Sequence, residues 1–264
     1  MPGKYRLATA LGECGSAPPV PRGPAPSRRE TAFRSAYRRQ VVRMVTLVPA
    51  AAASVRGLRV VVALHGLGGS AVAAAGHLAL GMTSAGVSRF AVITVDGGST
   101  YWHRRSDGDD PLGMIVHEVL PRAAAGGLDT GRIGIVGNSM GGYGALLLAE
   151  RLGARGAAAV AAASPAIFAS YADASAADRG AFDGPADFAR NSVFAGLGAL
   201  RRVPAWIDCG SSDPFAAMTL LLRSRLERLT GHSAQGGIEP GCHDNAFWAR
   251  GLPAELQFLG QHLP

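Results

Sequence analysis

One five-residue stretch of this chain has the residue types needed to turn a serine into a nucleophile. Gly137-Asn138-Ser139-Met140-Gly141 reads G-x-S-x-G, a pattern typical of a sharp turn that exposes a reactive serine between a strand and a helix. Residues 132–136 form a short apolar run that predicts a buried strand. Residues 142–152 are rich in helix formers. The alternative is a glycine-rich connection with an unreactive serine. Whether the chain also supplies a base and an acid for Ser139 distinguishes the two interpretations.

A serine hydroxyl needs a base within hydrogen-bond reach and an acid that orients the base. In this arrangement the acid follows a later strand, and the histidine comes on a loop before the last helix. Asp213 and His243 fit these two places. Asp208 is the rival acid, but it lies inside the predicted strand. Asp213 also fits a second interpretation, as the N-cap of the helix that begins near Pro214.

Attack on an acyl carbonyl also needs two backbone N–H groups that stabilise the developing oxyanion. The residue after the nucleophile, Met140, supplies one of them. The glycine-rich loop at residues 64–70 supplies the other, with Leu67 as our first choice and Gly68 as the second. His65 is expected to hold this loop in place. The alternative is a plain glycine turn, which the position of the loop after an early strand disfavours.

Three motifs together resemble the putative-esterase branch of the α/β-hydrolases, which includes esterase D/S-formylglutathione hydrolases and mycobacterial mycolyltransferases. They are Leu-His-Gly-Leu-Gly-Gly at 64–69, Gly-Asn-Ser-Met-Gly-Gly-Tyr-Gly-Ala-Leu at 137–146, and His243-Asp244-x-x-x-Trp248. The resemblance spans residues 36–263 and implies an α/β-hydrolase fold. It implies a serine hydrolase that cleaves carboxylic esters through an acyl-enzyme. An acyltransferase, a thioesterase and a non-catalytic binding protein on the same scaffold are the alternatives.

Aromatic residues near the predicted loops are candidate walls of the substrate pocket: Tyr101, Trp102, Phe215 and Trp248. Each of them fits core packing equally well. Few aromatic residues and a short cap predict a small acyl site, and hence a small-molecule substrate of the short-chain ester type. The chemistry needs no metal and no organic cofactor. The acidic run at residues 107–110 does not have the spacing of a calcium-binding loop.

The hydrophobic pattern alternates between strands and helices, which predicts an α/β fold with a mostly parallel sheet covered by helices on both faces. A hydrolase domain is predicted over residues 36–264, with a small cap at 166–202. The expected strands are 37–48 (at an edge), 58–64, 90–95, 132–136, 157–163, 205–209 and 233–238. The expected helices are 71–85, 112–125 with an interruption at Pro121, 142–152, 215–230 and 252–262.

The positive charge of the chain is concentrated near its N-terminus. Nine Lys and Arg and two Glu precede Thr46, and this excess accounts for the whole net charge of +7. Residues 1–30 are also proline-rich, so we predict a disordered basic leader rather than a nucleic-acid site. No apolar run is long enough to cross a bilayer, so stable membrane insertion is not expected. The leader lacks the apolar core of a secretory signal, which makes a cytoplasmic location the default expectation. The oligomeric state is left open.

Three cysteines are too few for a disulfide framework. Cys209 and Cys242 each precede one of the predicted catalytic loops, so a disulfide between them is one possibility. Buried free thiols are the favoured interpretation.

Overall fold

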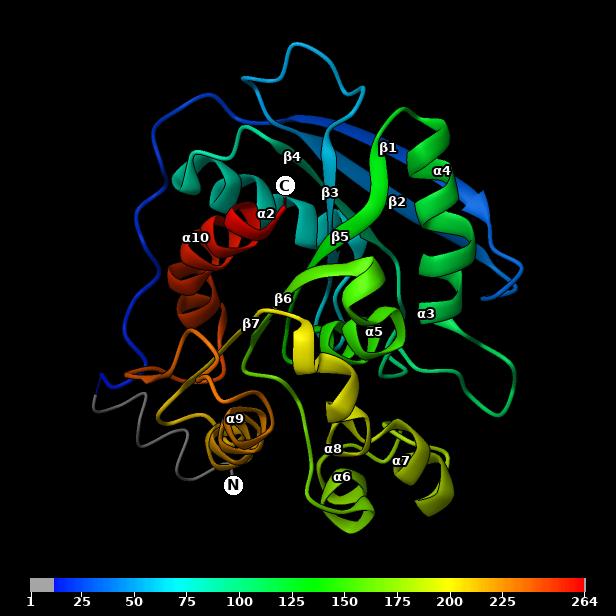
Figure 1. Ribbon diagram of the computed structural model, residues 1–264, viewed down its shortest axis with the longest axis vertical. Coiled ribbons are helices and arrows are strands. Elements are labelled where there is room, and N and C mark those ends of the chain that lie inside the picture. The colour runs from blue at the N-terminus through cyan, green and yellow to red at the C-terminus, as the bar shows by residue number, and fades with distance from the viewer. Residues whose placement is uncertain (1–11, 264) are drawn as a thin grey trace.

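The computed structural model describes residues 12–263 of the chain, and Figure 1 shows it as a ribbon. In this range eight strands form one sheet in the order β1-β2-β4-β3-β5-β6-β7-β8. The β1–β2 and β2–β4 pairs are antiparallel, and every other pair is parallel. The strands are β1 Ser27–Arg34, β2 Val41–Val48, β3 Arg59–Leu64, β4 Phe90–Val95, β5 Asp129–Asn138, β6 Ala157–Ala163, β7 Ala205–Gly210 and β8 Ile238–Glu239.

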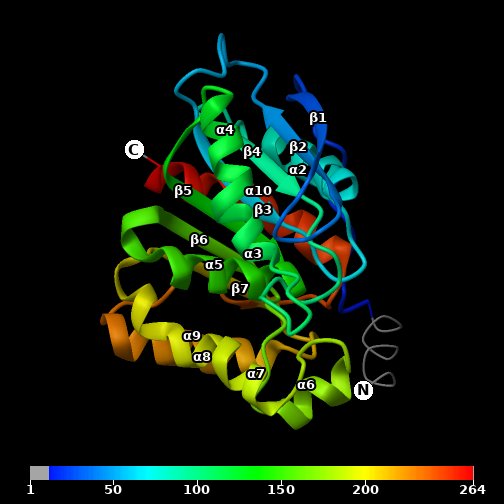
Figure 2. The same cartoon turned by 90° about the vertical axis from the view of Figure 1, so that its right-hand side faces the viewer.

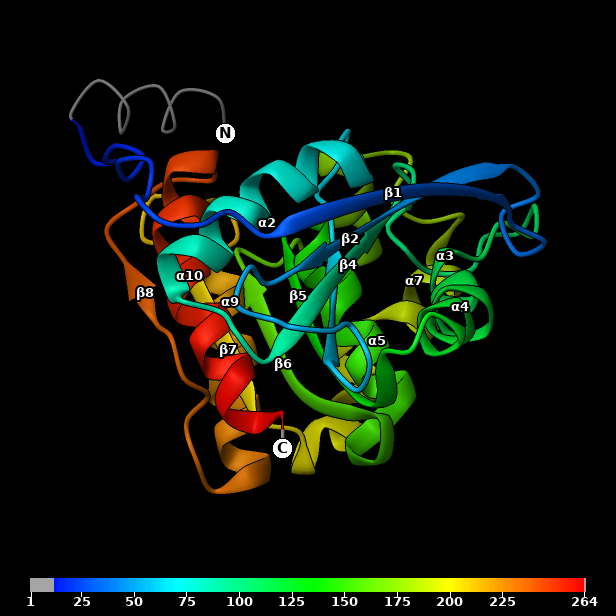
Figure 3. The same cartoon turned by 90° about the horizontal axis from the view of Figure 1, so that it is seen from above.

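Helices cover both faces of this sheet. Figure 2 shows α3, α4 and α5 in front of the strands and α10 behind them. Figure 3 shows α2 and α10 beside each other. The helices are α2 Ala71–Ala85, α3 Pro111–Met114, α4 Leu120–Ala125, α5 Met140–Gly156, α6 Tyr171–Ala177, α7 Pro185–Asn191, α8 Val193–Gly196, α9 Ala216–Thr230 and α10 Asn245–His262. A π-helical turn, η1 Ile115–Val119, joins α3 to α4, and a 3₁₀ segment, η2 Leu197–Arg202, follows α8.

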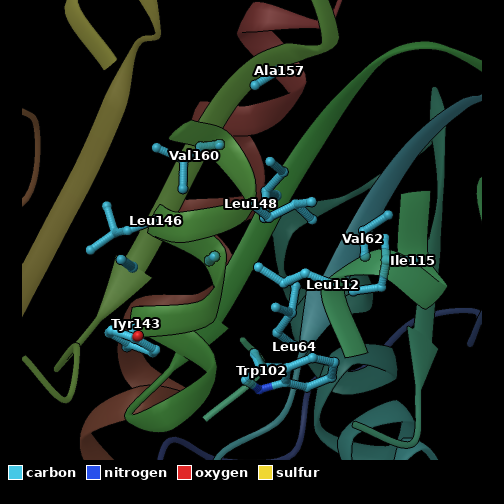
Figure 4. Packing of buried hydrophobic residues seen from close by; sticks show 14 of the residues in the cluster. Val62, Leu64, Trp102, Leu112, Ile115, Tyr143, Leu146, Leu148, Ala157 and Val160 are labelled. Atoms are coloured by element: carbon cyan, nitrogen blue, oxygen red, sulfur yellow. The ribbon is translucent and has the colours of Figure 1, made fainter. Parts of the chain in front are cut away.

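The core is divided into two apolar layers by the alternation of side chains along each strand. On β3, Val60, Val62 and Leu64 belong to the layer under α3 and α5. Figure 4 shows Val62 and Leu64 in this layer, with Trp102 beside Leu64. Val61 and Ala63 point to the other face, into the layer with α2 and α10. The central strands are therefore buried on both sides, as expected for parallel strands between helices.

The predicted α/β fold with a mostly parallel sheet is confirmed. The helix at 71–85 and the strands at 90–95 and 157–163 have the predicted bounds. The helix at 111–125 is interrupted before Pro121 by the π-helical turn.

Several boundaries differ from the prediction. The last strand, expected at 233–238, is only Ile238–Glu239, and the strand and helix on either side of Ser139 are longer than expected, at Asp129–Asn138 and Met140–Gly156. The predicted leader reaches residue 30, but Ser27–Arg34 forms β1 and pairs along its whole length with β2. Its polar side chains stay largely exposed, as an edge strand allows, so they hid the strand in the sequence. The strand predicted at the edge of the sheet is therefore β2, the second strand from that edge. The last helix begins at Asn245, not at 252, because Asp244 caps it and Pro253 does not end it. Residues 1–11 of the predicted leader lie outside the described range.

The segment between β6 and β7 holds α6, α7, α8 and η2. Figure 1 shows α6, α7 and α8 together at the lower end of the molecule. Aromatic rings anchor it. Phe182 contacts Tyr101, with ring centroids 5.8 Å apart, and stacks on His103 at 4.9 Å. Asp187 of α7 accepts a hydrogen bond from Nε2 of the buried His103 at 3.0 Å. The segment predicted as a small cap is thus packed on the domain. None of the described helices is long and apolar enough to cross a membrane.

Candidate active site

Ser139 occupies a strained turn between β5 and α5. Its backbone has φ 56° and ψ −123°, a region that residues with a side chain avoid unless their surroundings impose it. Three hydrogen bonds hold the Ser139 backbone in this conformation. The Ser139 N–H donates to Ala163 O at 2.9 Å, and the Ser139 carbonyl accepts from Tyr143 N–H and from Ala166 N–H, both at 3.0 Å. The turn is therefore held from β6 on one side and from α5 on the other.

Two glycines make this turn possible, because the surrounding backbone leaves no room for a side chain at either position. A Cβ atom on Gly137 would lie 3.0 Å from Gly142 N and closer still to the Gly141 carbonyl. A Cβ atom on Gly141 would lie 2.6 Å from the Leu64 carbonyl carbon and 2.8 Å from His65 O. Ordinary van der Waals contact begins near 3.5 Å. The first turn of α5 consequently rests directly on the backbone that leads out of β3.

The structure brings the three predicted chemical residues into one hydrogen-bonded chain. The Ser139 Oγ and His243 Nε2 atoms are 2.8 Å apart, and His243 Nδ1 and Asp213 Oδ2 are also 2.8 Å apart. The Asp213 side chain is fully buried, whereas that of His243 is 21% exposed. One edge of the imidazole therefore faces a protected carboxylate, and the other faces the serine near the surface.

Asp213 uses both of its carboxylate oxygens. While Oδ2 faces His243, Oδ1 accepts a hydrogen bond from Phe215 N–H at 2.8 Å, just before α9 begins. The N-cap interpretation of Asp213 is wrong, because the N-cap of α9 is Phe215 and no side chain caps this helix. The rival Asp208 is 3% exposed and accepts a hydrogen bond from Trp206 Nε1 at 2.8 Å. It lies on β7, and no hydrogen bond joins it to His243 among the described residues.

The free thiol beside the acid is kept in its protonated form. Burial, followed by the negative charge of Asp213, raises the pKa of Cys209 to about 12. Cys209 therefore adds no charge that would compete for the imidazole.

The glycine-rich loop after β3 is held by His65, as predicted. His65 Nδ1–H donates to Gly66 O at 2.8 Å, and Nε2 accepts from Gly97 N–H at 3.0 Å. Burial lowers the pKa of His65, which favours the neutral ring that this pair of bonds requires. Gly66 lies close to the nucleophile, because a Cβ atom on it would be 3.6 Å from Ser139 Cβ.

Two N–H groups next to Ser139 are available to bind an anion. The Leu67 N–H has no acceptor among residues 12–263, whereas Gly68 N–H donates to Ser99 Oγ at 3.3 Å. Met140 is the first residue of α5, so its N–H has no carbonyl one turn earlier to bond. The positive end of the α5 dipole adds to this environment. Leu67 therefore remains our choice over Gly68.

Of the four aromatic residues predicted as pocket walls, two are buried in the core. Tyr101 is 4% exposed and Trp102 is fully buried, and Trp102 Nε1 donates to His65 O at 3.2 Å. Trp102 thus supports the loop after β3, Tyr101 packs against Phe168 and Phe182, and neither residue lines the cavity beside the loop. Phe215 and Trp248 instead flank His243, with ring centroids 5.2 and 5.0 Å from the imidazole.

A cavity of about 300 Å³ opens beside the loop and runs between α2 and α10. Its walls are mostly small and apolar, and they include Asn138, the neighbour of Ser139, together with Trp248. Glu255 also lines it, about 10 Å further along α10 than Trp248. Burial, followed by the charge of Asp208, raises the pKa of Glu255 well above its usual range. The Glu255 carboxyl group is therefore held toward its uncharged form, in a cavity whose walls include several alanine and glycine residues and also His65 and His77.

The cysteines differ from the prediction. Cys14 and Cys242 form a disulfide, and Cys209 is free and buried. The pairing was missed because Cys14 lies in the segment that the sequence marks as a leader. Cys14, Cys242 and Asp244 are also the one group of potential metal ligands in the described residues. The two sulfurs are bonded to each other, so they do not act as thiolate ligands.

The sheet order, the strained serine after β5 and the histidine loop before α10 define an α/β-hydrolase fold. Comparison with solved structures agrees. The chain is similar to an S-formylglutathione hydrolase from Agrobacterium tumefaciens, with a TM-score of 0.75 and 16% identity over 92% of this chain and 98% of the other.

Two further solved structures are similar at the same level. A ferulic acid esterase has a TM-score of 0.75 and 21% identity, covering 90% of this chain and 98% of its own. MPT51 (FbpC1) of Mycobacterium tuberculosis has a TM-score of 0.75 and 15% identity, covering 91% and 100%. Neither a comparison with family models nor one with curated proteins finds a match. The resemblance predicted from the motifs is confirmed at the level of the fold.

Proposed function

We propose that this protein is a carboxylic ester hydrolase that forms an acyl-enzyme on Ser139. The observation that carries the proposal is the continuous chain from Ser139 Oγ through His243 to the buried Asp213, with 2.8 Å at each step. A structural histidine would need no second partner on its Nε2 edge. Here that edge meets a hydroxyl on a strained turn, which is the arrangement that activates a nucleophile.

The reaction follows from the positions of these groups. Ser139 Oγ attacks the ester carbonyl while His243 Nε2 takes its proton. Asp213 holds the imidazole with its Nδ1–H toward the carboxylate and stabilises the imidazolium that forms. The N–H groups of Met140 and Leu67 bind the oxyanion. His243 then returns the proton to the leaving alcohol, and a water molecule deprotonated by His243 releases the acid.

The cavity beside the loop supports a short, uncharged acyl group as the part of the substrate that is recognised. Its volume of about 300 Å³ is at the lower end of the range for small-molecule sites. Trp248 lines this cavity and packs on the His243 ring, and Asn138 next to Ser139 also lines it, although Ser139 and His243 themselves do not. Most of the residues that line the cavity are apolar or glycine, which favours an alkyl chain over a carboxylate.

The test is turnover of p-nitrophenyl esters from acetate to octanoate by the wild-type protein and by Ser139→Ala. We expect the variant to lose at least about 10³-fold in kcat, and the wild type to prefer the shorter esters. Ser54→Ala, at an exposed serine between β2 and β3, is the matched control and should keep wild-type turnover. A fluorophosphonate probe should label Ser139 in the wild type. Equal turnover by wild type and Ser139→Ala, or labelling of another residue, refutes the proposal.

A further inference from the structure

A short N-terminal segment, Glu13–Ser16, lies against the two loops that carry the acid and the base. Cys14 is joined by a disulfide to Cys242, the residue directly before His243. Ser212, the residue directly before Asp213, donates a hydrogen bond from Oγ to Glu13 Oε2 at 2.8 Å. In Figure 1 this part of the chain is the dark blue end beside the orange segment between α9 and α10. One segment thus contacts both loops from outside.

Arg250 of α10 fastens the same segment from the other side. Its guanidinium donates to Ser16 O at 2.9 Å, to Cys14 O at 3.3 Å, and to Pro240 O at 3.3 Å. Pro240 belongs to the loop that leads to His243. Gly15, with φ +71°, lets the guanidinium approach, because a Cβ atom there would lie 2.8 Å from Arg250 Nη1.

The loops that carry Asp213 and His243 also contact each other, so a displacement of one loop displaces the other. Ser212 N–H donates to Gly241 O at 2.9 Å. Gly210 packs so closely on Gly241 that a Cβ atom on it would be 2.5 Å from the Gly241 carbonyl carbon. The Asp213–His243 distance is therefore set by a unit of two loops, and Glu13–Ser16 is bonded to both of them.

We propose that the Cys14–Cys242 disulfide is a redox-dependent clamp that positions His243 and Asp213 for catalysis. This inference rests on the proposed esterase function. The disulfide holds Glu13–Ser16 in place, and this segment restrains the loops through Cys242 and Ser212. Cys14 and Cys242 are thus positioning residues, and the fully active form belongs to oxidising surroundings, where disulfides persist.

A dithiol opens the clamp by thiol–disulfide exchange. One thiolate of the reductant attacks Cys14 Sγ, because Cys14 is the less buried of the two residues at 7% against 0% exposed. This forms a mixed disulfide and releases Cys242, which takes up a proton. The second thiol of the reductant then displaces Cys14. The protein gains two electrons and two protons, and the reductant becomes a disulfide. Oxidised glutathione reverses the change and leaves as two molecules of reduced glutathione.

The experiment compares oxidised and dithiothreitol-reduced wild type on p-nitrophenyl acetate, with Cys14→Ser as the matched control. Loss of the clamp should lower kcat by roughly 10- to 100-fold, because a misplacement near 1 Å costs about that much, while KM changes less than about twofold. The pH profile of kcat should change shape. Oxidised glutathione should restore the wild type, and neither reagent should change Cys14→Ser.

Thiol alkylation with mass spectrometry should modify Cys14 and Cys242 only after reduction. Thermal melts should show that the reduced protein is folded at the assay temperature. The clamp is refuted if reduced, alkylated protein keeps its kcat, if purified protein contains no Cys14–Cys242 bond, or if the reduced protein unfolds at that temperature. The failure of the proposed function is a separate result, because the oxidised wild type would then show no Ser139-dependent turnover at all.

Discussion

The contact between α5 and the backbone after β3 gives a quantitative prediction for Gly141→Ala. The added methyl carbon would lie 2.6 Å from the Leu64 carbonyl carbon and 2.8 Å from His65 O. Both neighbours are backbone atoms, so no side chain can turn away to make room. Contact at a normal distance then requires α5 and the loop after β3 to separate by at least about 1 Å, because Leu64 O lies closer still to the added carbon.

That separation acts on the N–H groups of Met140 and Leu67, which lie on the two parts that must move apart. A misplacement of this size typically costs about 10²-fold, and loss of one oxyanion donor costs about 10²–10³-fold. We therefore expect kcat to fall by at least about 10²-fold. Overpacking of this kind destabilises by about 1–3 kcal/mol. In a domain of this size this lowers the melting temperature by roughly 2–12 °C.

The assay combines p-nitrophenyl acetate kinetics with a thermal melt followed by circular dichroism. Gly76→Ala is the matched control, since Gly76 is exposed within α2 and a Cβ atom there meets nothing within 4 Å. It should raise stability by about 0.5–1 kcal/mol and leave kcat unchanged. If Gly141→Ala keeps both wild-type kcat and the wild-type melting temperature, the inferred packing of the serine turn is wrong.

Three other predictions concern buried charges. Asp213→Asn should lower kcat by about 10⁴-fold with little change in melting temperature, because the amide no longer holds the required imidazole tautomer; a loss under tenfold contradicts this role. Burial raises the pKa of Glu150 to about 8, so its contribution to stability is present below its usual pKa near 4.5 and is lost as pH rises to about 8. At pH 9 the free energy of unfolding of Glu150→Gln should therefore exceed that of the wild type by on the order of a few kcal/mol, and at pH 4.5 the difference should be much smaller. Equal differences at both pH values would contradict the burial effect. Asp109→Ala should cost about 3–5 kcal/mol in urea unfolding, because it strips the bidentate partner from the Arg38 guanidinium, which is 4% exposed; a loss within about 0.5 kcal/mol would show that the pair behaves as a surface pair.

The sequence predicted the parts of the site that depend on chain order. Ser139, Asp213 and His243 each follow an element whose hydrophobic pattern is clear, and parallel strands bring the ends of such elements to the same edge of the sheet. Leu67 was preferred over Gly68 from the loop pattern alone, and the bond of Gly68 N–H to Ser99 supplies a physical reason for this choice.

Features that depend on packing between distant segments were not predicted. The sequence left open whether Tyr101 and Trp102 line the pocket or pack in the core, and in the structure Trp102 fills the space between β3 and α5. Gly144 makes that space, since a Cβ atom there would be 2.6 Å from Trp102 Cγ. The disulfide was missed for a similar reason, because proline-rich composition near Cys14 carries no information about the loop on which it lies.

The cavity beside the glycine-rich loop has many alanine and glycine residues in its walls, among them Ala73 and Ala74 on α2 and Ala249 on α10. A single nucleotide change converts an alanine codon into one for valine or threonine, so one mutation narrows the cavity or gives it a hydroxyl. None of these positions belongs to the serine turn or to the loops of Asp213 and His243. Substrate preference can therefore evolve by point mutation in this scaffold while the reacting groups stay unchanged.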